Sequence, residues 1–134
     1  MNNSLDNCLA NILNVIKILQ NNADKTECQD NTCTKPFLGL NTTFVCFNTR
    51  PIMLYRCDNT PVTLNYTNED GLQATTNIFR VESVSNDSVG VLLLEATTGD
   101  DGVTTYTSTN TYATINLGCV CAVRCLPDTI VNNV

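Results

Sequence analysis

The chain has 134 residues, and its 13 Asp and Glu against 7 Lys and Arg give a formal net charge of −6. Such an acidic chain has no electrostatic footprint for phosphate, which argues against a nucleic-acid partner. There is no His, which excludes Ser-His-Asp and Cys-His catalysis and His-ligated zinc. Hydrophobic residues make up 43% of the chain, so it is neither a polar linker nor a disordered tail.

Residues 5–20 are predicted to form one amphipathic helix. Apolar side chains recur at spacings of three and four from Leu5 to Leu19, which gives a wide apolar stripe. Ser4 is the predicted N-cap, and Asp6 in the first turn suits the helix dipole. The stretch is too short and too often interrupted by polar residues for a membrane span or a signal peptide. We therefore expect neither a membrane segment nor a targeting signal.

From residue 36 the hydrophobic period changes to two, which predicts strands. Residues 21–35 are polar and are expected to form a loop. Turns are predicted at residues 57–60, 86–87 and 98–102. The predicted strands are 43–48, 52–56, 61–66, 78–84, 88–97 and a segment from 103 to 124 that is interrupted near 108–110. A helix followed by antiparallel strands over residues 36–125 predicts a mainly β protein. We expect a single domain, residues 1–134, folded as a β-sandwich or jelly-roll-like sheet pair.

The segment from Gly102 to Val123 contains no charged residue. Natural sheets commonly place Lys or Glu on exposed edges, because charge blocks edge-to-edge pairing. Two interpretations stay open. The segment is either a central strand pair that its own sheet buries, or a surface that pairs with another copy.

The eight cysteines are the second unusual feature. Zinc binding is disfavoured because no paired C-x2-C spacing occurs, and redox catalysis because no C-x-x-C motif occurs. Disulfides are the third possibility, although a domain of this size does not need several of them for folding. Cys8 on the apolar helix face and Cys46 between Val45 and Phe47 are expected to be small buried residues.

The last cysteines form a cluster from Cys119 to Cys125. In an extended chain, Cys119, Cys121 and Cys125 share one face, because side chains alternate. Cys119 and Cys121 are too close in sequence to bridge each other without strain. Each therefore needs a partner elsewhere in the chain or in another chain. No catalytic constellation is present, so we expect no enzyme and no cofactor.

Four segments together resemble the CotZ/CotY/ExsY family of bacterial spore coat and exosporium proteins. They are Cys33–Gly39 (CTKPFLG), Arg50–Tyr55 (RPIMLY), Ile78–Val84 (IFRVESV) and Gly118–Leu126 (GCVCAVRCL). The resemblance implies a structural protein that self-assembles into a two-dimensional, often hexagonal lattice around the endospore, crosslinked by disulfides. Carried over by position, it implies crosslinking cysteines at Cys28, Cys33, Cys119, Cys121 and Cys125. Cys8, Cys46 and Cys57 are then buried or secondary thiols.

The resemblance also implies where the subunit acts and with what. Such subunits are made in the mother cell cytoplasm without a signal peptide, and they are oxidised on the spore surface after the mother cell lyses. The expected partners are other copies, arranged as rings of six, and other coat or exosporium proteins. Two alternatives stay open: a cysteine-rich zinc-binding or adaptor module that anchors other surface proteins, and a filament subunit, because a head-to-tail contact that does not close gives a filament.

Overall fold

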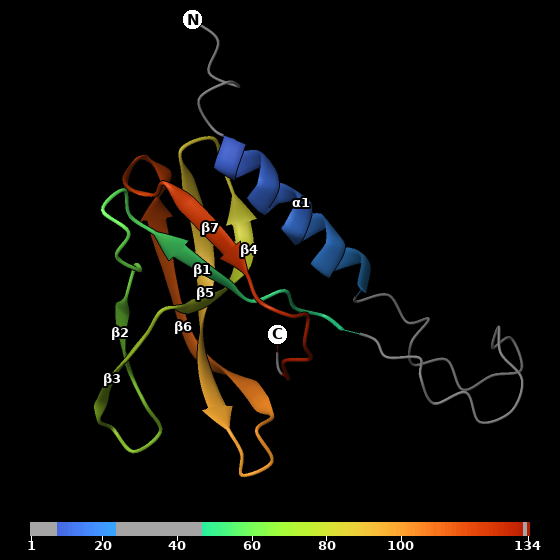
Figure 1. Ribbon diagram of the computed structural model, residues 1–134, viewed down its shortest axis with the longest axis vertical. Coiled ribbons are helices and arrows are strands. Elements are labelled where there is room, and N and C mark those ends of the chain that lie inside the picture. The colour runs from blue at the N-terminus through green and yellow to red at the C-terminus, as the bar shows by residue number, and fades with distance from the viewer. Residues whose placement is uncertain (1–7, 24–46, 133) are drawn as a thin grey trace, which may run out of the picture.

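The computed structural model describes residues 8–23, 47–132 and 134, which contain one α-helix and seven strands. In chain order (Figure 1) the elements are α1 (Cys8–Ala23), β1 (Ile52–Tyr55), β2 (Leu64–Thr67), β3 (Gln73–Thr76), β4 (Ile78–Val84), β5 (Ser88–Thr98), β6 (Thr104–Asn116), the 3-10 turn η3 (Leu117–Cys119) and β7 (Ala122–Cys125). All pairs of these strands are antiparallel. The predicted fold class, mainly β with one N-terminal helix, is confirmed. The packing of a sandwich or jelly roll stays a prediction.

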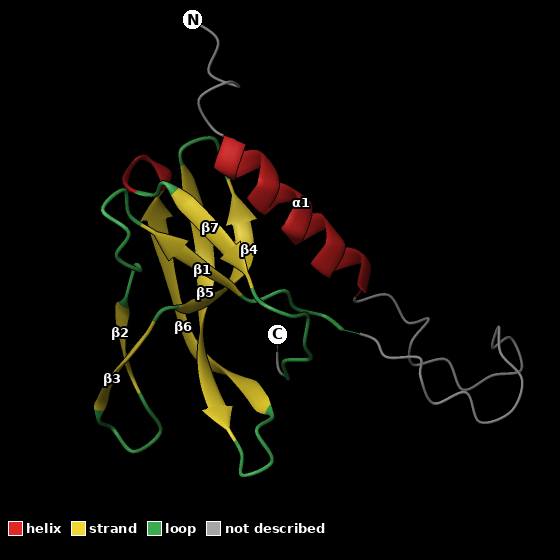
Figure 2. Cartoon of the chain, viewed as in Figure 1, coloured by secondary structure: helices red, strands yellow, loops and turns green. Residues whose placement is uncertain are grey.

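In the described part of the chain, five strands form one sheet in the order β6-β5-β4-β1-β7, and β2 and β3 form a separate two-stranded sheet (Figure 2). The β4–β5 pair begins where Ile78 lies opposite Leu94. The last residues of β5 therefore have no neighbour in β4. They pair only with β6, and the two strands extend beyond the sheet as an arm that ends in the turn at residues 99–103.

The strand predictions differ in their outcome. β4 has the predicted bounds, and β5 is one residue longer than predicted. β3 was not predicted. The long segment after residue 103 divides into β6, η3 and β7 rather than continuing as a strand. Of the predicted strand at 43–48, residues 43–46 lie outside the described residues, and Phe47 and Asn48 belong to no strand.

One face of the five-stranded sheet carries the main core. Residues at alternate positions of β1, β4 and β5, such as Leu54, Phe79 and Val91, are fully buried there. Helix α1 covers this face with Leu13 and Ile16. Alternation along the strands and the spacing of three in the helix bring these side chains together.

The opposite face carries a smaller cluster. Leu92 and Leu94 of β5 are fully buried, although their strand neighbours point to the main core. The C-terminal segment lies over this face, where Val131 is 1% exposed and packs against both leucines. Because both faces of β5 are covered at this point, its sequence is a continuous apolar run rather than an alternation.

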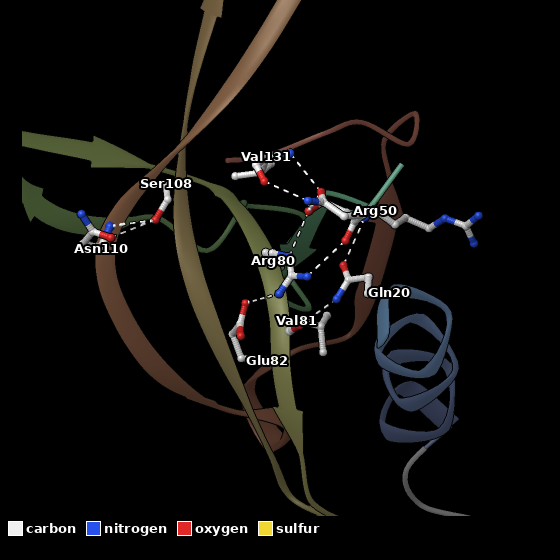
Figure 3. Close-up of polar contacts among 10 residues, drawn as sticks. Gln20, Arg50, Arg80, Val81, Glu82, Ser108, Asn110 and Val131 are labelled. Carbon is white, nitrogen blue, oxygen red and sulfur yellow. Dashed lines mark hydrogen bonds and ion pairs between the residues drawn. The ribbon is translucent and has the colours of Figure 1, made fainter. Parts of the chain in front are cut away.

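Gln20 joins α1 to the sheet through its side-chain amide (Figure 3). The amide nitrogen donates to the Val81 carbonyl at 2.8 Å, and the amide oxygen accepts from the Arg50 backbone N–H at 3.1 Å. Ile52 pairs with Phe79, so Arg50 and Val81 stand where the next ladder bonds between β1 and β4 would form. The Gln20 side chain supplies those bonds in a buried position, where unpaired polar groups are costly.

A polar network fixes the C-terminal segment. The buried guanidinium of Arg80 donates to the Thr49 hydroxyl at 2.9 Å, to the Glu82 carboxylate at 2.6 Å and to the Asn48 carbonyl at 3.1 Å (Figure 3). The Asn48 side-chain oxygen in turn accepts from the Val131 N–H at 2.9 Å. Each charged or polar group in the network therefore has a partner, as burial requires.

Strand β6 continues through residues 108–110, where an interruption was predicted, but its pairing with β5 is irregular there. The pairing of β5 with β6 shifts register between Leu92 and Leu94. Asn110 has a positive φ of 59°, a conformation that Asn tolerates better than most residues. The Ser108 hydroxyl accepts from the Asn110 N–H at 3.1 Å (Figure 3). The Thr109 hydroxyl donates to the Leu93 carbonyl at 2.8 Å. The bulge divides β6 into a half within the sheet and a half within the arm.

Candidate functional site

Cys57, Cys119 and Cys121 lie at the end of the sheet where β1 ends and η3 leads into β7. Cys57 and Cys121 form a disulfide there, with their Cα atoms 4.9 Å apart. The two residues are 64 positions apart in sequence. Backbone bonds align them: the Cys121 N–H donates to the Tyr55 carbonyl, and Asn59 closes the turn after Cys57 with a φ of 72°. A bridge over such a long loop stabilises the folded chain by about 4 kcal/mol in the loop-entropy model.

This disulfide joins Cys121 to a residue of its own chain. The resemblance implies that Cys121 is a crosslinking residue and that Cys57 is a buried or secondary thiol. The structure instead pairs the two within the chain. While this bond is formed, Cys121 has no thiol to offer to a neighbouring molecule.

Three other described cysteines are exposed and form no disulfide: Cys8 at the start of α1, Cys119 in η3 and Cys125 at the end of β7. Cys119 and Cys125 were predicted crosslinking residues, and their exposure fits that role. Cys28, Cys33 and Cys46 lie outside the described residues.

The expectation that Cys119, Cys121 and Cys125 share the face of one strand is wrong. The chain makes the 3-10 turn η3 before β7, and the Asn116 side chain stabilises the turn by accepting from the Gly118 N–H at 2.8 Å. The strand begins only at Ala122. The turn therefore separates the exposed thiol of Cys119 from the bonded sulfur of Cys121.

Cys8 was predicted to be buried, and this is corrected by its exposure. Helix α1 is apolar on two sides. Leu13 and Ile16 pack against the sheet, whereas Ile12 and Val15 are 44% and 55% exposed. Cys8 lies four residues before Ile12 and therefore shares the outer stripe, because positions four apart stand on one side of a helix. Spacing alone does not distinguish the covered stripe from the uncovered one.

Strand β6 forms one edge of the five-stranded sheet. Among the described residues, no backbone hydrogen bond joins β6 to a strand other than β5. The interpretation of the uncharged segment as a buried central strand pair is therefore wrong for β6. Thr104, Thr105 and Thr107 are exposed, and Tyr112 is 63% exposed.

An open polar pocket of about 440 Å³ lies between the β2–β3 turn and the arm. Glu69, Asp70 and Glu95 line it together with Tyr66. Burial, and then the negative charge of Glu95, raise the pKa of Tyr66 above its ordinary value. The described residues contain no group of three Cys, Asp or Glu side chains arranged to hold a metal ion. The zinc alternative also involves Cys28 and Cys33, so it stays untested.

Neither α1 nor any other helix of the described residues is long and apolar enough to cross a bilayer.

The described residues thus form antiparallel sheets and one helix, with three exposed thiols. A comparison with protein families finds a match to the spore coat protein Z family over residues 1–111. Because this match spans more than half of the chain, the protein belongs to the spore coat protein Z family, and the suspected resemblance is confirmed. The match ends before the cysteine cluster that begins at Cys119. No curated protein and no solved structure was found to match the chain.

Proposed function

We propose that this spore coat family member is a structural subunit that assembles with copies of itself into a disulfide-crosslinked, two-dimensional lattice. The observation that carries the proposal is the exposure of three thiols without disulfides, on Cys8, Cys119 and Cys125. The other two described cysteines, Cys57 and Cys121, form a disulfide within the chain. The exposed thiols are therefore not needed for folding and are free to join molecules.

The positions of the thiols favour a network over a simple pair. Cys8 begins the helix, whereas Cys119 and Cys125 flank the start and the end of the edge strand β7. A subunit that is crosslinked through two separate places can join more than one neighbour. In the lattice we propose, a head-to-tail contact closes into a ring, of six copies by the family resemblance, and a second contact joins the rings.

The location follows from the same chemistry. The subunit is made in the reducing mother cell cytoplasm, where thiols persist, and it is oxidised at the spore surface after lysis. In this proposal the noncovalent contacts set the lattice, and the disulfides then make it resistant to dissociation. Its place is the outer coat or exosporium, with other coat proteins as further partners.

Negative-stain electron microscopy of the purified protein, with and without reductant, tests the proposal together with a non-reducing gel. We expect sheets or rings, and a heat-resistant ladder of bands that collapses to 14.6 kDa on reduction. The variant Cys8→Ser/Cys119→Ser/Cys125→Ser is expected to assemble but to lose most of the ladder. Wild type, prepared in parallel under the same oxidant, is the control. A dispersed monomer in every condition would contradict self-assembly.

A further inference from the structure

The outer edge of β6 carries a row of backbone groups that β5 does not use. The Leu117 N–H donates to the Asp87 carbonyl. Bonded and non-bonded pairs alternate along an antiparallel ladder, so Ile115 and Ala113 are the next residues of β6 that bond to β5. The N–H and C=O groups of Tyr112, Thr114 and Asn116 therefore point away from the sheet.

Charge does not protect this edge. No residue from Gly102 to Val123 is charged, although natural edge strands commonly carry Lys or an equivalent block. The edge at the other side of the sheet, β7, has only four residues and includes Arg124. In a chain of net charge −6, β6 is a place where two copies can meet without bringing carboxylates together.

The half of β6 beyond the bulge, Tyr112–Asn116, is the better docking strand. It is backed by β5 and, across β5, by β4, so its geometry is fixed before a partner arrives. The half before the bulge belongs to the two-stranded arm, which the rest of the sheet does not support. Preorganised edges lose less conformational entropy on pairing.

We propose that Tyr112–Asn116 pairs with the same segment of a second copy, antiparallel, about a two-fold axis at Thr114. The inference rests on the proposed self-assembly and names its noncovalent contact. Thr114 then lies opposite Thr114 of the second copy, and Tyr112 lies opposite Asn116. An isologous contact of this kind cannot build a ring by itself, so it supplies the contact that joins one ring to the next.

The first test is a charge placed at the axis. Thr114→Lys puts two ammonium groups directly opposite each other, which disfavours pairing. Under reducing conditions we expect association by sedimentation velocity to weaken at least tenfold. Thr63→Lys is the matched control, because it adds the same charge at an exposed position between β1 and β2 and is expected to associate like wild type. Circular dichroism of both variants establishes that they fold.

The second test traps the contact without disturbing it. Residues directly opposite in a bonded antiparallel pair have Cα atoms about 5.5 Å apart, a span that a disulfide bridges. Thr114→Cys, in the Cys8→Ser/Cys119→Ser/Cys125→Ser background, should therefore give a dimer on oxidation. Tyr112→Cys is the control: two such residues would lie roughly 13 Å apart along the strands and should not bridge.

The outcomes separate the two proposals. If wild type assembles but Thr114→Lys assembles equally well, or if Tyr112→Cys crosslinks as fast as Thr114→Cys, the β6 contact is wrong and self-assembly stands. If wild type itself stays monomeric, the proposed function fails and the edge contact fails with it.

Discussion

Gln20 and Val81 are 61 residues apart in sequence, yet the side-chain amide of one donates to the backbone carbonyl of the other at 2.8 Å. This bond and its counterpart to Arg50 place the end of α1 at the point where β1 and β4 diverge. The helix is thus held by a specific polar contact as well as by its apolar face.

We predict that Gln20→Met destabilises the fold by about 1–3 kcal/mol. Met keeps the side-chain volume but leaves the Val81 carbonyl and the Arg50 N–H without their hydrogen bonds to Gln20. Urea unfolding followed by circular dichroism measures the change. Asn14→Ala, on the exposed side of the same helix, is the control and should not lower the free energy of unfolding.

The Arg80 guanidinium is predicted to hold the C-terminal segment against the sheet. Arg80→Lys keeps the charge but cannot keep the three bonds to Thr49, Glu82 and the Asn48 carbonyl, so we expect a loss of about 2 kcal/mol. Hydrogen exchange should quicken at the Val131 and Thr129 amides, which bond to residues 48 and 49. Arg124→Lys, in the exposed strand β7, is the control. Unchanged exchange at Val131 in Arg80→Lys would contradict the role.

The disulfide between Cys57 and Cys121 is predicted to stabilise the monomer rather than the lattice. Cys57→Ala/Cys121→Ala should lower the free energy of unfolding by about 4 kcal/mol, and a thermal melt with and without reductant would show the same difference for wild type. Cys119→Ser/Cys125→Ser should leave the oxidised melting temperature of the monomer unchanged. An equal loss in both variants would show that the exposed thiols also support the fold.

The free energy of unfolding should depend on pH through the carboxyl group of Asp128. The paired hydrogen bonds from Arg50, at 2.7 and 3.0 Å, hold the pKa of Asp128 below its ordinary value. A lowered pKa in the folded state means that this stabilisation is complete above the unfolded value near about 4 and is lost as the pH falls through the folded pKa.

Asp128→Asn should therefore cost about 0.5–1 kcal/mol at neutral pH, since the pair is partly exposed. The difference from wild type should shrink below about pH 4. Urea titrations at several pH values measure it, with Asp100→Asn in the exposed turn of the arm as the control. A difference that stays constant down to pH 2 would exclude the ion pair as its source.

The elements with clear periodicity could be predicted from the sequence. The bounds of β4 could be predicted because apolar residues recur along Ile78–Val84 and a turn follows the strand. β3 was missed because Gln73–Thr76 has neither apolar alternation nor large side chains. Its strand conformation depends on pairing with β2, which is a tertiary contact.

The candidate site was predictable in residue type but not in arrangement. The exposure of Cys119 and the disulfide of Cys121 depend on the 3-10 turn η3, which ends at Cys119. The side chain that stabilises this turn belongs to Asn116, one of many Asn residues in this sequence. Cys57 becomes the partner of Cys121 only because β1 and β7 are neighbours. Strand order is set by the whole chain, so neither this pairing nor the edge position of β6 follows from local pattern.

The clamp between residues 48–49 and 129–131 also has a topological consequence. The Asn48 and Thr49 N–H groups both donate to the Thr129 carbonyl, and the Thr129 N–H returns a bond to Thr49. The β part of the chain thus begins and ends at one point. An insertion at the tip of the arm, between Gly99 and Gly102, would therefore leave this contact in place and stand clear of the helix.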